Sequence, residues 1–337
     1  MTKKWVLGCD IGGTSVKYAR VFEDGTLSET GRAVVQEEHK TQEGMLGLLL
    51  DIVQEQRDAH GSEHFAGMGI GIAGVIDQPD GLMRQSPNFP LWHDFPIKQQ
   101  LQEALPGKSI AIENDVNAIA LGEHWTGAAA GEKNFIMLAI GTGLGGAVFL
   151  NGALWTGMHG MAGEIGHTNV VPFNGRPCNC GASGCLEAYV SQVGLKQTIE
   201  KHPREEFRQM FRRLPPTQWP EKLSELAGEG NEDAEKIFRQ WGLYLGITIG
   251  SLLNVLDIER VLIGGGVGRA LPHFRKSLVA QMNQHCFKAI ARRALISPCT
   301  LGDNAGIIGS AALAFADSGV ALAEYSGSQN SSDTILS

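Results

Sequence analysis

Residues 135–150 read FIMLAIGTGLGGAVFL, an apolar stretch, a glycine-rich hexapeptide and a second apolar stretch. The glycine spacing also fits a dinucleotide-binding loop, but such a loop requires a helix directly after the glycines. Residues 147–150 are instead apolar and favour a strand, so the sequence predicts a glycine-rich β-hairpin and excludes the dinucleotide loop. Backbone N–H groups of such a hairpin can bind phosphate oxygens. The alternative is a tight hairpin with glycines chosen only for turn geometry.

The same order of elements occurs at the start of the chain. Residues 5–9 are apolar, residues 10–14 read DIGGT, and residues 16–22 form another predicted strand. Each copy ends on a hairpin signal, Asp24-Gly25 in the first and Asn151-Gly152 in the second. We interpret this as a duplicated α/β unit, and 337 residues suit two related domains. Because the loops occupy equivalent places, a shared phosphate site is favoured over turn geometry alone.

Strand and helix patterns alternate along the rest of the chain, which predicts an α/β protein. Apolar spacing predicts helices over 42–59 and 231–255, the second with Asn231 as its N-cap. Residues 191–213 look helical and strongly charged. The wider charged stretch, 196–230, has no assigned function, and a solvated surface helix is favoured over an oligomer interface.

Composition and charge restrict the class of protein. With 43% hydrophobic and 19% charged residues, the chain has the composition of a folded globular protein. The net charge of −8 argues against a general grip on nucleic acid or on an anionic membrane. Neither an apolar run of about 18 residues nor a signal peptide is present in the sequence, so we expect a cytoplasmic protein.

The first glycine loop is flanked by residues suited to phosphate chemistry. Asp10 lies between a strand end and the loop, where a carboxylate can hold Mg²⁺ directly or through water. Thr14 could add a hydroxyl and Lys17 a cation, although Lys17 could equally be a solvated strand residue. We therefore expect Asp10, Gly12, Gly13, Thr14 and Lys17 to bind the phosphate group and its metal.

Residues Glu113-Asn114-Asp115 close a predicted strand and open a predicted helix. Taken alone, Asp115 is most often a helix N-cap. However, ligands of α/β sheets sit at the carboxyl ends of strands, where a carboxylate could accept the proton of an attacking hydroxyl. Asn114 could hydrogen-bond the same substrate.

A loop-rich region holds three of the six cysteines and one histidine. Cys178, Cys180 and Cys185 follow His167, and this set matches a tetrahedral structural Zn²⁺ site with no open position. The alternative is three reduced, buried thiols. Glu164 and Glu187 flank the region and are either surface charges or acceptors for a polyhydroxylated ligand.

A third glycine cluster follows a predicted strand at residues 260–263. There Gly264-Gly265-Gly266 could let an adenine or ribose lie against the backbone. A simple strand-to-helix turn is an equally good interpretation of this stretch alone.

Together these motifs resemble the ROK family (repressor, open reading frame, kinase) of bacterial sugar kinases and regulators. DIGGT at 10–14 and IGTGLGG at 140–146 resemble its two phosphate motifs, and Asn114-Asp115 resembles its catalytic pair. The zinc and sugar signature of the family is similar to Glu164-x-x-His167 with the three cysteines and Glu187. The resemblance covers about residues 5–317.

The resemblance implies two actin-like, ribonuclease-H-like ATPase domains around a central cleft, with a small structural zinc site. It also implies ATP-dependent phosphorylation of a hexose, most readily glucose, at the 6-hydroxyl. Asp115 would be the general base, and the expected sugar contacts are Asn88, Asn114, Asp115, Glu164, His167 and Glu187. The expected nucleotide contacts are those of the first loop with Gly141, Thr142, Gly143, Gly145, Gly146, Gly265 and Gly266. His167 would serve metal and sugar through different ring nitrogens.

The implied domains are residues 1–116 with about 303–320, then residues 117–302, followed by a disordered tail at 321–337. The implied cofactors are ATP, Mg²⁺ and structural Zn²⁺. The expected partners are a hexose and a second copy of the chain, because members are often homodimers. No nucleic acid or membrane partner is expected.

Other functions remain open at this point. An N-acetylglucosamine or N-acetylmannosamine kinase is the second choice, and allose, mannose and fructose are further substrates to consider. A sugar-responsive repressor would carry a DNA-binding segment before the first phosphate motif, and four residues are too few for a helix-turn-helix. A sugar-binding regulator without catalysis is the third reading.

Overall fold

We describe a computed structural model of the chain over residues 3–78 and 80–319. Two compact units divide the chain. Unit 1 consists of Met1–Lys133, Phe149–Ala162 and Thr300–Ser337, and unit 2 of Asn134–Val148 and Gly163–Cys299. The tail expected to be disordered, 321–337, lies outside the described residues, as does the serine-rich segment within it.

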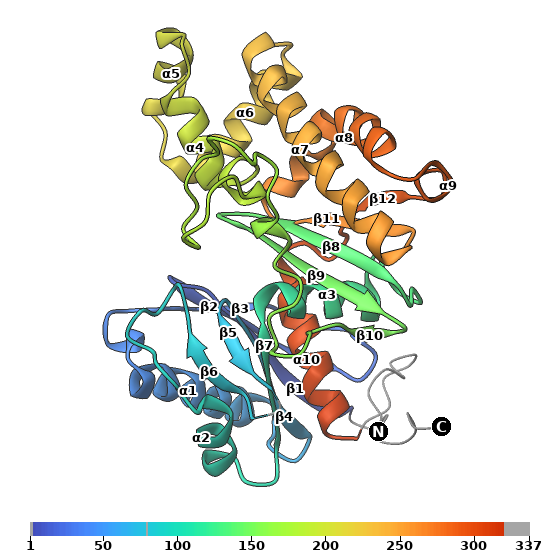
Figure 1. Cartoon of the computed structure of the whole chain (residues 1–337). Coiled ribbons are helices and arrows are strands. Elements are labelled where there is room, and N and C mark those ends of the chain that lie inside the picture. The colour runs from blue at the N-terminus through green and yellow to red at the C-terminus, as the bar shows by residue number, and fades with distance from the viewer. Residues whose placement is uncertain (1–2, 79, 320–337) are drawn as a thin grey trace. The chain divides into compact units, whose positions relative to one another are not determined.

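Unit 1 is built on a five-stranded sheet (Figure 1). Its strand order is β3 (Gly31–Val34), β2 (Ser15–Phe22), β1 (Trp5–Ile11), β4 (Phe65–Ile72) and β7 (Ser109–Asn114). Strands β1, β2 and β3 pair antiparallel, whereas β1, β4 and β7 run parallel. The carboxyl ends of the three parallel strands therefore share one edge of the sheet.

Alternate residues of β1 enter different cores, as the two-residue period of a strand requires. Trp5 and Leu7 pack with α1 (Gln42–His60) and α2 (Ile97–Ala104) on one face. Val6 packs on the other face with α10 (Ala305–Asp317), which also contacts α3 (Asp115–Thr126). Both faces of this sheet are thus covered by helices, and its strands are buried on both sides.

The second sheet has the order β10 (Ala153–Leu154), β9 (Leu144–Leu150), β8 (Phe135–Ile140), β11 (Arg260–Gly264) and β12 (Leu295–Pro298). Strands β8, β11 and β12 run parallel, and β10 pairs antiparallel with β9. Position by position this repeats the order of the first sheet. The repeated order supports the duplicated unit that the sequence predicts, and β9 after the glycines confirms the predicted hairpin.

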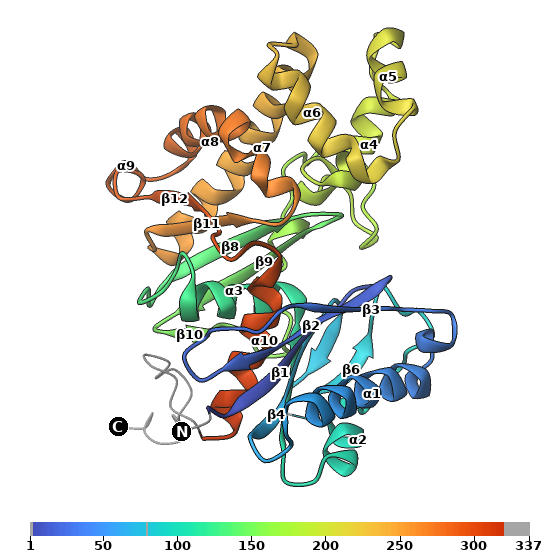
Figure 2. The ribbon, with the colours of Figure 1, turned by 180° about the vertical axis from the view of Figure 1, so that it is seen from behind.

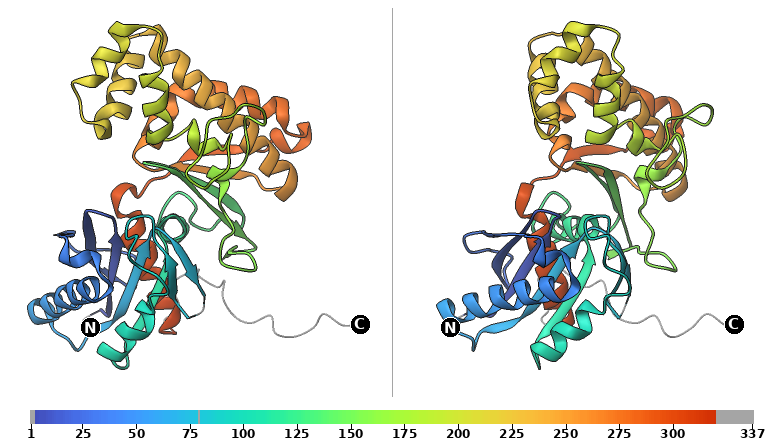
Figure 3. Two further views of the ribbon diagram at one scale, coloured as in Figure 1. Left: turned by 60° about the vertical axis from the view of Figure 1, so that its left-hand side comes forward. Right: turned by 90° about the vertical axis from the view of Figure 1, so that its left-hand side faces the viewer.

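Helices α7 (Glu232–Leu256) and α8 (Leu271–His285) pack side by side in unit 2 (Figures 2 and 3). The close approach depends on Gly242 and Gly246, where an added Cβ would lie 2.6 Å from the Phe274 carbonyl oxygen and 2.5 Å from that of Leu278. Within the described residues, the remaining elements are β5 (Val75–Asp77), β6 (Leu82–Gln85), α4 (Gln192–Glu200), α5 (Glu205–Arg212), α6 (Trp219–Gly228), α9 (Lys288–Ala291) and six short 3-10 turns.

The predicted helices at 42–59 and 231–255 are confirmed as α1 and α7. Asn231 caps α7 by accepting hydrogen bonds from the backbone of Asp233 and Ala234, both at 3.1 Å. The single helical stretch expected at 191–213 is instead two helices, α4 and α5. Pro203 explains the break, because it lacks an N–H donor and disfavours helix at the residue before it. Among the described residues, no helix is long and apolar enough to span a membrane.

Candidate functional site

The first glycine loop joins β1 to β2 in unit 1. Gly12 donates its backbone N–H to the Ser15 carbonyl at 3.0 Å, which closes the turn. A Cβ added at Gly13 would lie 3.4 Å from the Asn88 side chain, so that side chain lies directly against the loop. The structure therefore brings Asn88 to the loop, although 75 residues separate them in the sequence.

Asp10 and Lys17 face each other across the β1–β2 pair, because they are direct partners in its register. Burial raises the pKa of the Asp10 carboxyl, Lys17 lowers it, and the negative charge of Asp303 raises it further. A Cβ at Gly306 would lie 3.4 Å from Asp10 Cγ, so the first turn of α10 also lies against this carboxyl. A partly buried carboxylate near a second acidic group is suited to a hard divalent cation.

At the β7–α3 junction, Asn114 rather than Asp115 is the helix N-cap. The Asn114 side-chain oxygen accepts hydrogen bonds from Val116 N–H at 2.9 Å and Asn117 N–H at 3.3 Å. The N-cap interpretation of Asp115 is therefore wrong, because its neighbour fills that role and Asp115 is the first helical residue. Asn114 aligns with Ile72 of β4 and, through it, with Ile11 of β1. The pair and the first glycine loop thus lie at one sheet edge, two strand spacings or about 10 Å apart.

Glu113 is a buried carboxylate directly beside this pair, and the sequence analysis assigned it no role. Its Oε1 accepts hydrogen bonds from the Asn114 backbone at 2.8 Å and from Asn117 Nδ2 at 3.1 Å. Gln78 Nε2 reaches Oε2 at 3.4 Å. Burial raises the pKa of Glu113, and these hydrogen bonds lower it. An acceptor side chain, Glu113, and a donor side chain, Asn117, lie four residues apart across the start of α3, and this spacing is the signal that could have revealed the contact.

The second glycine loop, between β8 and β9, is braced by Glu187. Its Oε2 accepts a hydrogen bond from Leu144 N–H at 2.9 Å. A Cβ at Gly143 would lie 2.3 Å from the same oxygen, so only glycine fits there without displacing the carboxylate. The turn itself spans Gly141 to Gly143, while Gly145 and Gly146 lie within β9. Glu187 therefore has a contact that the sequence analysis did not anticipate.

The third glycine cluster lies beside the second loop, because β11 and β8 are parallel neighbours with Gly264 opposite Ala139. Gly265 has a φ of +81°, and a Cβ there would lie 2.3 Å from the Ile140 carbonyl oxygen. Gly266, Gly141 and Thr142 line one pocket of about 530 Å³, wholly within unit 2. That volume falls in the range of roughly 300–1,000 Å³ that is usual for small-molecule sites.

The four predicted zinc ligands come together in unit 2. The ligand atoms of His167, Cys178, Cys180 and Cys185 all lie within 4.8 Å of one another. Cys180 Sγ and Cys185 Sγ are 3.7 Å apart, and Cys178 Sγ is 3.6 Å from His167 Nδ1. Tetrahedral zinc with bonds of about 2.3 Å to sulfur and about 2.05 Å to nitrogen needs separations of about 3.8 Å and 3.6 Å. The chemistry of the donor set and these two separations therefore fit Zn²⁺.

The two ring nitrogens of His167 face different groups. Nδ1 faces Cys178 in the cysteine cluster, whereas Nε2 lies 3.7 Å from Glu164 Oε2. Burial raises the pKa of the Cys185 thiol to about 12, so holding it as a thiolate requires a neighbouring positive charge such as a metal ion. Cys178 also lies 3.8 Å from Glu187 Oε1, which links the cluster to the second glycine loop.

The predicted residues thus form one group in each unit. In unit 1 the first loop, Asn88 and the Asn114–Asp115 pair lie at or beside one sheet edge. In unit 2 the second loop, the third glycine cluster, Glu187 and the cysteine cluster are joined by the contacts above. Two sheets of equal strand order, each with a glycine hairpin at the corresponding place, define the actin-like, ribonuclease-H-like ATPase class of fold.

Comparison with known proteins identifies the family within this class of fold. The model of the ROK family matches residues 6–317, and this chain belongs to that family. It is 33% identical to the glucokinase of Halalkalibacterium halodurans, over 92% of this chain and 94% of that protein. The Thermotoga maritima glucokinase is 32% identical, over 93% of this chain and 98% of that protein. A crystal structure of a ROK family glucokinase from Streptomyces griseus, in complex with glucose and AMPPNP, is 30% identical with a TM-score of 0.74, covering 92% of this chain and 98% of that one.

Proposed function

We propose that this chain is an ATP-dependent hexose kinase that transfers the γ-phosphoryl group of ATP to the 6-hydroxyl of glucose. Similarity to glucokinases over more than nine-tenths of the chain supports the reaction class. The observation that carries the proposal is the β7–α3 junction. There Asn114 caps the helix, and Asp115 lies at the sheet edge that also holds the first glycine loop.

Asp115 is the proposed general base that accepts the proton of the sugar hydroxyl as its oxygen attacks phosphorus. Asn114, Asn88, Glu164, His167 and Glu187 hold the sugar by hydrogen bonds. The carboxylates among these side chains can accept hydrogen bonds from sugar hydroxyls, and the amides can both donate and accept them.

The donor phosphates bind to the backbone of the two glycine hairpins. Thr14 and Lys17 add a hydroxyl and a positive charge beside the first hairpin, and Gly265 and Gly266 admit the nucleoside. Asp10 is the proposed holder of Mg²⁺, because its partly buried carboxylate lies beside that hairpin. When bound, the metal neutralises phosphate charge.

A zinc ion at His167 and the three cysteines is proposed to be structural. Three thiolates and an imidazole fill a tetrahedral site, so no position is left for substrate. Its proposed role is to hold the loops around the 3-10 turn Ile165–His167, which also carry Glu164. We further propose that the protein is cytoplasmic and forms homodimers without nucleic acid.

A panel of hexoses with ATP tests the proposed function. The assay follows ADP release with glucose, N-acetylglucosamine, N-acetylmannosamine, mannose, allose and fructose at equal concentration. We expect the largest kcat/KM for glucose and a product phosphorylated at the 6-hydroxyl. A clear preference for an N-acetylhexosamine would show that the proposed substrate, glucose, is wrong. Sugar binding without ADP release would show that the protein is a sugar-binding regulator and not a kinase.

A further inference from the structure

The pocket in unit 2 has a wall that the glycine motifs do not supply. One side is formed by Gly141 and Thr142 of the second glycine loop and by Gly266. The wall contains Thr217 of a 3-10 turn (Pro216–Gln218) together with three residues of α6, namely Pro220, Glu221 and Ser224. All four belong to the charged stretch 196–230, for which the sequence suggested only a solvated surface or an oligomer interface.

Gln192 connects this wall to the glycine loop. The backbone N–H of Gln192 donates to the Gly141 carbonyl at 3.0 Å, and that of Val193 donates to the Thr142 carbonyl at 3.2 Å. The first turn of α4 therefore sits on the loop. The Gln192 side chain then donates from Nε2 to the Pro216 carbonyl at 2.8 Å, at the residue before Thr217. One residue thus bonds to both sides of the pocket.

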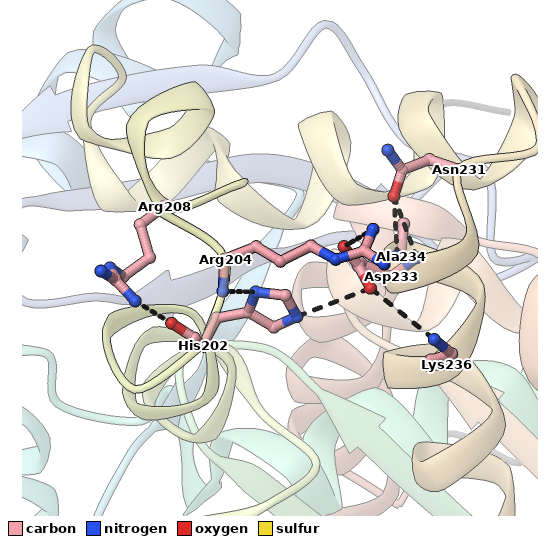
Figure 4. Close-up of polar contacts among 7 residues, drawn as sticks. All are labelled: His202, Arg204, Arg208, Asn231, Asp233, Ala234 and Lys236. Atoms are coloured by element: carbon pink, nitrogen blue, oxygen red, sulfur yellow. Dashed lines mark hydrogen bonds and ion pairs between the residues drawn. The ribbon is translucent and has the colours of Figure 1, made fainter. Parts of the chain in front are cut away.

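The other part of the charged stretch is anchored on α7, as Figure 4 shows. Arg204 Nη1 donates to Asp233 Oδ2 at 3.0 Å, and His202 Nε2 lies 3.8 Å from Asp233 Oδ1. Asp233 is 6% exposed, so the accepting carboxylate is largely desolvated, whereas the Arg204 side chain is 59% exposed. Within the wall, the indole N–H of buried Trp219 donates to the Leu214 carbonyl at 3.0 Å. The segment reaching the pocket is therefore held at both of its ends.

The chemistry of the lining suits the nucleoside part of a phosphoryl donor. The lining includes the apolar side chains of Pro220, Val267 and Ala270 and the polar side chains of Glu221 and Ser224. A base needs apolar surface for its faces and hydrogen-bond partners for its edges. Because the pocket starts at a phosphate-binding loop, the remainder of the donor extends toward the wall. A donor without a nucleoside gains nothing from that wall.

We propose that Gln192 is a positioning residue for the nucleoside of the phosphoryl donor, because it fixes the wall Thr217–Ser224 against the second glycine loop. This inference rests on the proposed kinase function and adds to it a role for the charged stretch. It assigns donor selection, a nucleoside triphosphate over inorganic polyphosphate, to that wall.

The test compares Gln192→Ala and Gln192→Glu with wild type. Glutamate keeps the size of the side chain but removes its donor group. One lost hydrogen bond is worth roughly three- to tenfold in binding, so we expect KM for ATP to rise by that factor in both variants. The value of kcat and KM for glucose should stay within about twofold of wild type. Gln209→Ala, on the exposed side of α5, is the matched control and should change none of these values.

Competition experiments separate the nucleoside from the phosphates. Inhibition by adenosine should weaken in Gln192→Ala, while inhibition by inorganic tripolyphosphate should not change in this variant, which adds no charge beside the second glycine loop. Glu221→Ala, a wall variant independent of the Gln192 side chain, should weaken adenosine in the same way. This variant decides the question if the Gln192 variants do not fold.

The outcomes separate the inference from the proposed function. A wild-type protein that transfers no phosphoryl group from ATP to any sugar would refute the proposed function. If the wild type is active, unchanged adenosine inhibition in the Gln192 and Glu221 variants would refute the inference. Equal weakening of adenosine and tripolyphosphate would also refute it, since the wall would then not act on the nucleoside alone.

Discussion

At the scale of single residues, the β7–α3 junction divides two tasks between neighbouring side chains. Asn114 caps the helix with two hydrogen bonds, and Asp115 follows it as the first helical residue. A carboxylate in the first turn is also stabilised by the helix dipole. The pattern Asn-Asp therefore supplies both a stable helix start and a carboxylate at the sheet edge, which the interpretation of Asp115 as a simple cap did not recognise.

Glu113 makes a testable contribution to the pH dependence of stability. Burial raises its pKa above the ordinary 4.5, so the folded state binds the proton more tightly than the unfolded state. The group therefore contributes stability at pH below 4.5 that is lost as the pH rises toward its folded pKa. Relative to wild type, Glu113→Gln should gain in free energy of unfolding as pH rises from 4 to 8, measured by denaturant titration. A difference that is constant, or that grows in favour of wild type, contradicts this account.

At the scale of elements, some turns of the chain depend on a position that requires glycine. Gly265 is the clearest case, because its φ is +81° and a Cβ would overlap the Ile140 carbonyl. Gly266, the next residue, has no atom within 4 Å of an added Cβ and has a φ of −59°. The two neighbours thus differ in steric freedom while sharing a loop.

Substitution of these two glycines should therefore have unequal effects. We expect Gly265→Ala to lower the free energy of unfolding by about 2 kcal/mol or more, through backbone strain and overlap. Gly266→Ala should change it by less than about 0.5 kcal/mol, as is usual where no contact is altered. Chemical denaturation of both variants measures this difference. Equal losses would mean that the turn after β11 does not have the described conformation.

The loops around the cysteine cluster form an element that a metal ion would hold together. Cys180→Ser should lower zinc content and thermal stability together, because binding energy at a structural zinc site is also folding energy. Cys286→Ala is the control, since Cys286 lies outside the cluster and its variant should retain full zinc content. Elemental analysis and a melting curve provide the two readouts. Well-folded wild-type protein without zinc would refute the structural-metal prediction.

At the scale of the whole molecule, local patterns predicted elements better than they predicted contacts. The strand Phe135–Ile140 and the N-cap Asn231 could be predicted because period, turn residues and caps are local signals. The break between α4 and α5 was signalled by Pro203 and missed. The two hairpin patterns indicated a duplicated α/β unit, and the two sheets of equal strand order support it. The actin-like class of the fold was implied by the resemblance to the ROK family and not by the hairpins.

Contacts between distant segments could not be predicted in the same way. Nothing local indicates that Asn88 lies against Gly13, or that Glu187 binds the Leu144 backbone. Glu123 is a further case: it is 0% exposed, and its carboxylate accepts hydrogen bonds from the backbone of Ala128, Thr300 and Leu301. The contacts of Glu123 with Thr300 and Leu301 depend on how the chain returns to unit 1 after residue 299, which no motif encodes.

The turnover of Asp115→Asn, measured at saturating ATP and glucose, tests the central claim most directly. A positioned base contributes typically about 10²–10⁴-fold, so the variant should lose at least about two decades in kcat. Glucose binding, followed by calorimetry on the same preparation, should survive because asparagine keeps the size and hydrogen-bonding capacity of the side chain. Near-normal turnover in Asp115→Asn would contradict the account and remove this residue from the chemistry.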